Sequence, residues 1–143
     1  MAIYSLALRT TVTTISAASW GALSPATNEA AVMELGYFNG AATANVVGWG
    51  RSGNTPTLTG GVAFLPDDEG RPAGVTQAAV AFGTAPTVPT NFQRRFSTAA
   101  LVGAAVVFTF PRGLVLAGGG AAIVAWNITA NSAVVDIHAV VDE

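Results

Sequence analysis

The sequence contains no cysteine and no lysine, and it has a single histidine. The absence of cysteine excludes a disulfide framework and a thiolate metal site, and the absence of lysine excludes covalent lysine chemistry. Charge is also scarce: 10% of the 143 residues are charged and 51% are apolar, whereas a typical soluble domain has about 25% charged residues. So few charges cover a monomer's surface poorly. The composition therefore favours a protein whose surface is partly covered by partners, most simply by copies of itself.

Basic residues are too few and too scattered to form a nucleic-acid-binding face. The formal net charge is −2, and Arg94-Arg95 is the only basic pair; we interpret it as a solvated or interface turn. The first arginine, Arg9, follows apolar residues instead of preceding them, so we expect no signal peptide. Glycine, Arg112 and Asn127 interrupt the longest apolar stretches before about 18 residues. We therefore expect neither a nucleic acid nor a membrane as a partner.

Residues 46–61, VVGWGRSGNTPTLTGG, contain a complete G-x-G-x-x-G at Gly48, Gly50 and Gly53. In a dinucleotide-binding turn these glycines would open a helix whose N-terminus faces the phosphates. Here Pro56 and the Gly60-Gly61 pair prevent such a helix from growing. Asp67 and Asp68 follow the motif at nearly the sequence spacing expected of a ribose-binding acid, but they lie in a loop rich in proline and glycine. The motif is better explained as a glycine-rich strand and turn.

Alternation of apolar and polar residues with a period of two recurs along the chain and predicts strands. Short strands separated by short turns, with no long helical period, predict an all-β antiparallel β-sandwich with little helix, formed by one domain over 1–143. We count eight or nine strands. The extended segments from which this count is drawn are near 4–14, 32–38, 43–49, 57–65, 75–83, 92–97, 101–110, 114–117, 121–129 and 133–143. The expected loops and turns are 17–28, 51–54, 66–74, 84–91, 111–113, 118–120 and 130–132. The segment EAAVMELGYFNG, residues 29–40, could instead begin as a short helix capped by Asn28.

The sequence offers no catalytic constellation, so we predict no enzyme, no cofactor, no metal site and no small-molecule substrate, and leave the binding residues unassigned. His138 shares a strand face with Asp136, which could orient a base for a serine. No G-x-S-x-G is present, however, because Ser52 lies in GRSGN. We interpret His138 and Asp136 as a polar pair on the exposed or subunit-facing side of an edge strand.

Three further groups have both a functional and a structural interpretation. Asp67, Asp68 and Glu69 could bind calcium, but their spacing matches no loop motif, and a solvated charge run is the simpler interpretation. Glu29 and Glu34 suggest no acid–base couple. Residues 127–129, Asn-Ile-Thr, fit the glycosylation acceptor pattern, which we attribute to chance.

The tryptophans have two interpretations. Trp20, Trp49 and Trp126 could be sugar-stacking platforms if they shared an exposed face. Trp126 alternates with Val124 and Ile128, which favours a buried position, while Trp20 and Trp49 are flanked by glycine and remain open.

The C-terminal third, FTFPRGLVLAGGGAAIVAWNITANSAVVDIHAVVDE, resembles the closing hairpins of jelly-roll capsid decoration (cement) proteins of tailed bacteriophages. The segments AIYSLALRTT, ATNEAAVMELGYFNGAATANVVGWGR and GTAPTVPTNFQRRFS fit the same pattern, which extends over nearly the whole chain. The resemblance rests on strand and turn composition and includes no invariant chemical motif.

This resemblance implies a jelly-roll topology and a virion structural protein on the outer capsid surface, made in the host cytoplasm. Its implied partners are the major capsid protein and two further copies of the chain. Three chains of 14.4 kDa give a homotrimer of about 43 kDa. Residues 1–14 are then either an extended N-terminal arm that reaches a neighbour or the first strand. The alternative is a trimeric tail-fibre head or a carbohydrate- or receptor-binding module of a phage virion, using Trp20, Trp49 or the 66–74 loop.

Overall fold

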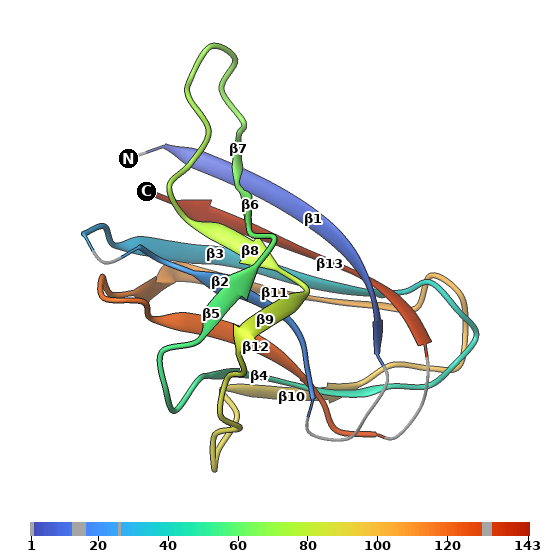
Figure 1. Cartoon of the computed structure of the whole chain (residues 1–143). Coiled ribbons are helices and arrows are strands. Elements are labelled where there is room, and N and C mark those ends of the chain that lie inside the picture. Colours follow the sequence, from blue (N-terminus) through green and yellow to red (C-terminus); the bar gives the residue numbers. More distant parts are fainter. Residues whose placement is uncertain (1, 13–16, 26, 130–132) are drawn as a thin grey trace.

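The computed structural model describes residues 2–12, 17–25, 27–129 and 133–143, and in these ranges it contains strands and no helix (Figure 1). The predicted all-β class is therefore confirmed. The alternative of a short helix from Asn28 is wrong, because residues from Ala30 onward form a strand. The described ranges also contain no helix long and apolar enough to cross a membrane.

The strands form two large antiparallel sheets and one small one. The first sheet has the order β11 (Ala105–Leu116), β3 (Ala30–Asn39), β13 (Ala133–Asp142), β1 (Ile3–Val12), β7 (Leu65–Pro66). The second sheet has the order β10 (Arg94–Ser97), β4 (Val46–Arg51), β12 (Ala122–Asn127), β2 (Ala18–Leu23), β8 (Gln77–Ala79), β6 (Val62–Ala63). The small sheet pairs β5 (Thr57–Thr59) with β9 (Ala81–Thr84).

The two large sheets pack face to face as a sandwich. Successive strands β1 to β4 alternate between the first and second sheets, and β10 to β13 alternate again. Strands β5 to β9 lie in the long connection between these two sets. This order is compatible with the predicted jelly roll, an eight-stranded sandwich built from two Greek keys.

A single core lies between the sheets. It includes side chains from Ala2 to Val141, so both ends of the chain contribute to the same hydrophobic cluster. Its largest members are fully buried, and the rings of Trp20 and Trp49 meet edge to face with centroids 5.6 Å apart. Burial raises the pKa of Tyr37.

The N-terminal segment is a strand inside the sandwich and not an arm. β1 pairs with β13 through ten consecutive residues and with β7 on its other side. Tyr4, Leu6 and Val12 point into the core, as the alternation of this segment dictates. Of the two alternatives for residues 1–14, the first strand holds for Ile3–Val12, while residues 13 and 14 lie outside the described residues.

Four other local expectations are wrong. β2 lies within 17–28, which we expected to be a loop because its residues are small. The expected strand 57–65 is divided into β5, β6 and β7, because the chain moves between sheets there. β11 continues through the expected turn 111–113 with an irregular register between Thr109 and Leu114. β13 lies between β3 and β1 and is not an edge strand. The expected turn 130–132 lies outside the described residues.

The two edges of the sandwich differ. At one edge the chain passes directly from β6 of the second sheet to β7 of the first, and the fully buried Phe64 fills the space between them. At the other edge β10 and β11 are the last strands of their sheets, as β6 and β7 are at the first edge, but the aromatic side chains there are only partly buried. We call these the closed edge (β6, β7 and the 66–74 loop) and the open edge (β10 and β11).

Candidate functional site

The outer face of the second sheet is covered by its own chain. Ala122, Val124 and Trp126 of β12 form a second buried cluster, against which Phe92 packs. Phe92 belongs to the segment between β9 and β10, and Phe82 of β9 lies over Gly21 of β2. A strand buried on both faces reads as continuously apolar, as β12 does. This outer face is therefore buried by the protein's own chain and is not free to bind a partner.

The G-x-G-x-x-G motif makes room for that cover. A Cβ on Gly48 would lie 2.7 Å from Cε1 of Phe92, and a Cβ on Gly50 would lie 2.8 Å from Cγ of Pro89, both inside van der Waals contact. Both glycines lie on β4, Gly53 lies in the bend after it, and no helix follows. The prediction of a glycine-rich strand and turn is confirmed. No pattern in the sequence indicates that Phe82, Pro89 and Phe92 cover this face.

The outer face of the first sheet has no such cover within the described residues. Its strands β11, β3, β13 and β1 present many apolar side chains outward, and Val107 is 46% exposed. The half-buried or exposed apolar residues of this face are Ile3, Ala7, Ala31, Met33, Phe38, Ala105, Val107, Val115, Val134 and Val140. This surface is the strongest candidate for binding a partner, because apolar area that is left in water favours association.

Four charged or titratable groups of this face form two pairs, Arg9 with Asp136 and His138 with Glu34, whereas Asp142 has no ion-pair partner among the described side chains. Arg9 on β1 forms two hydrogen bonds of 2.8 Å with the carboxylate of Asp136, directly opposite on β13. The hydrogen bond from Arg9 lowers the pKa of Asp136, and the pKa of Arg9 is raised in turn. Asp136 is thus paired with Arg9 and not with His138, although both β13 side chains lie on the predicted common face.

His138 has a different partner from the one the sequence suggested. Its Nε2 lies 2.7 Å from Oε1 of Glu34 on β3, and its ring covers Gly36. Ser5 lines the same shallow hollow as His138, but its hydroxyl donates to Asp67 at 2.5 Å. The geometry therefore gives His138 a cross-strand hydrogen bond instead of a hydrogen bond to a serine nucleophile.

We expect His138→Ala to keep the fold and to lower the free energy of unfolding by no more than about 1 kcal/mol, because the pair that it breaks is partly exposed. Urea unfolding followed by tryptophan fluorescence measures this. Glu34→Gln, which retains a hydrogen-bonding oxygen, is the matched control and should change less. A loss of turnover on any substrate, with the fold retained, would show instead that His138 is catalytic.

The three tryptophans are not surface platforms. Trp20 and Trp49 lie in the main core and Trp126 lies in the cluster beneath Phe92, each at most 1% exposed. The expected burial of Trp126 is confirmed, although it lies outside the space between the sheets. None of these rings can stack on a sugar without unfolding its surroundings. Stacking of a sugar on Trp20 or Trp49, which the carbohydrate-binding alternative requires of these residues, therefore lacks an exposed ring.

The 66–74 loop is exposed and charged, as predicted. Asp68 pairs with Arg71 at 3.0 Å, and Asp67 accepts the hydrogen bond from Ser5. Over the described ranges no group of three or more His, Asp or Glu side chains is placed to hold a metal ion. Asn127, in the glycosylation pattern, is 1% exposed, so its amide is inaccessible in the folded chain.

No protein-family model matches this chain, and no characterised protein is similar to it in sequence. The features that bear on function are therefore the two outer faces and the two edges of the sandwich.

Proposed function

We propose that the protein is a non-enzymatic structural protein of a virion, a decoration (cement) protein that binds the outer shell of a tailed-bacteriophage capsid as a homo-oligomer. The observation that carries this proposal is the difference between the two outer faces. One is covered by the protein's own chain, and the other exposes an apolar surface across four strands. The resemblance noted in the sequence supplies the class of partner, the major capsid protein.

The composition of the exposed face suits attachment to a repeating protein shell. Its apolar side chains contribute binding energy when they leave water. Arg9 is paired with Asp136 and His138 with Glu34, so among the described charged groups of this face docking would bury only Asp142 without an ion-pair partner. A protein that binds at many copies stabilises the shell by mass action, because it binds the assembled form.

The test introduces charge into this face. We expect the double variant Val107→Glu and Val140→Glu to fold and to lose co-sedimentation with capsids that lack the protein, with affinity falling at least about a hundredfold, because two charges would be buried without partners. The matched control is Val80→Glu and Val88→Glu, since both valines are exposed but lie on the segment between β8 and β10. The control should bind like the wild type.

Equal binding of both double variants would exclude the first sheet as the attachment surface. Failure of the wild type to bind capsids, together with binding to host cells or glycans, would favour the tail-fibre or receptor-binding alternative. Because Trp20 and Trp49 are buried, the 66–74 loop would then be the part of that alternative to substitute first.

A further inference from the structure

The open edge of the sandwich exposes aromatic rings. Phe96 of β10 and Phe108 of β11 face each other across the edge with centroids 5.4 Å apart, and both are only partly buried. Phe110 is likewise half-buried, and the guanidinium carbon of Arg94 lies 5.4 Å from the centre of its ring. These rings lie between the sheets, where a further strand or loop would complete their burial.

The open edge is also basic. Arg94 and Arg95 on β10 and Arg112 on β11 are all exposed. None of them forms an ion pair with any side chain in the part of the chain that the structure describes. Arg51, at the end of the neighbouring β4, donates to the carbonyl of Val115 on β11. Three exposed arginines without an ion-pair partner thus lie on the two strands that carry the partly exposed phenylalanines, and Arg94 lies against the ring of Phe110.

The closed edge has the complementary character. Leu65 of β7 is 59% exposed, and Val62 of β6 and Val75 beyond the loop are exposed as well. The loop from β7 toward β8 projects past the sheets (Figure 1) and contains Asp67, Asp68 and Glu69, against the single Arg71. Glu69 has no ion-pair partner among the described side chains.

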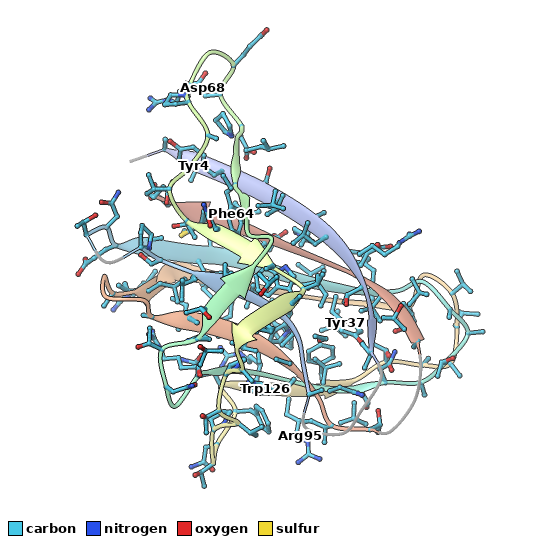
Figure 2. All side chains as sticks on the ribbon, in the orientation of Figure 1. Tyr4, Tyr37, Phe64, Asp68, Arg95 and Trp126 are labelled. Carbon is cyan, nitrogen blue, oxygen red and sulfur yellow. The ribbon has the colours of Figure 1, made fainter. Side chains whose placement is uncertain are left out.

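The two edges lie on opposite sides of the molecule. The strand orders place β7 and β6 at one end of the two sheets and β11 and β10 at the other. Figure 2 shows Asp68 on the projecting loop and Arg95 on the far side of the sandwich. One copy therefore presents acidic and aliphatic groups on one edge, and basic and aromatic groups on the other.

We propose that copies of this chain associate head to tail, with the closed edge of one copy docked on the open edge of the next. Leu65 and Val62 would cover the phenylalanines of the open edge, and the acids of the 66–74 loop would face Arg94, Arg95 and Arg112. This inference rests on the homo-oligomeric part of the proposed function, but it does not depend on capsid attachment. It goes further by naming the two contacting surfaces.

The contact joins two different surfaces, so it is heterologous. Such a contact closes into a ring when the rotation between copies permits and otherwise continues as a filament. A pairing of two open edges would instead bring like charges together. The charge distribution thus favours a head-to-tail contact, in a ring or in a filament, over a two-fold dimer.

The test reverses the charge of each edge separately and then of both together. We expect Arg94→Glu with Arg95→Glu, and separately Asp68→Arg with Glu69→Arg, to raise the dissociation constant of self-association at least about tenfold, because each places like charges face to face. The variant with all four substitutions has the net charge of the wild type and restores opposite charges across the contact. It should associate as the wild type does. Sedimentation velocity at micromolar protein, without capsids, measures this.

Arg9→Asp with Asp136→Arg is the control, since it exchanges charges on the outer face of the first sheet, away from both edges. It should leave association unchanged. Far-UV circular dichroism checks that each variant is folded. Added salt should weaken the association of the wild-type protein, because it screens the opposite charges of the two edges. A monomeric wild type, edge variants that associate normally, or a folded four-substitution variant that stays monomeric would each overturn the proposal. None of these outcomes would bear on capsid co-sedimentation.

Discussion

A chain lacking residues 2–12 is expected not to fold. The deletion removes β1, which forms a ten-residue ladder with β13 and also pairs with β7. It takes Tyr4, Leu6 and Val12 out of the core. Truncation of one large buried side chain costs about 2–5 kcal/mol, and a domain's whole stability is about 5–15 kcal/mol. Loss of three such side chains together with the ladder therefore exceeds what the remaining sandwich can supply.

Far-UV circular dichroism and the elution volume on gel filtration measure the outcome, which should be an unfolded or aggregated chain. The control substitutes the outward-facing Ala7 and Thr11 of the same strand with serine, and it should fold normally. If the truncated chain were folded, assembled like the wild type and failed only to bind capsids, the segment would be an attachment arm. The register of β1 and β13 indicates the opposite.

The sequence predicts the strands that are half-buried and alternate regularly. In β13, buried and partly exposed residues alternate without exception, so hydrophobic periodicity suffices to find it. Alternation also predicts β1, whereas β3, whose burial pattern is irregular, is predicted from Gly36, Tyr37 and Phe38. The sequence does not predict β2, because Ser19, Gly21 and Ala22 resemble loop residues. They form a strand because β2 pairs with β12 on one side and with β8 on the other, and Gly21 leaves room for the ring of Phe82.

Long-range contacts account for the other differences. The prediction of a turn at 111–113 treated Pro111 and Gly113 as a local signal. Because β11 is an edge strand, it tolerates a proline and an irregular register there. The partner of His138 is Glu34, 104 residues away, and spacing along one strand cannot identify it. The candidate binding surfaces cannot be identified from the sequence either, because its excess of apolar residues does not show which face of the sandwich is left uncovered.

The substitution Gly48→Ala is expected to destabilise the protein by about 2–3 kcal/mol, the cost of inserting atoms into a packed site. The added Cβ would lie 2.7 Å from two atoms of the Phe92 ring and closer still to a third. Phe92 packs against the buried cluster of β12, so the ring cannot move outward without exposing apolar surface. The midpoint of urea unfolding should fall with an unchanged slope.

The matched control is Gly53→Ala in the same motif. Its Cβ would lie 3.6 Å from Cβ of Thr87, an ordinary contact, so the free energy of unfolding should change by less than about 1 kcal/mol.

The double variant Gly48→Ala with Phe92→Ala isolates the contact. Removing the ring relieves the overlap, so the combined loss should be smaller than the sum of the two single losses by at least about 1 kcal/mol. Additive losses, or a Gly48→Ala protein as stable as the Gly53→Ala protein, would show that Phe92 does not pack on Gly48. The outer face of the second sheet would then be open, and the difference between the two faces that supports capsid attachment through the first sheet would disappear.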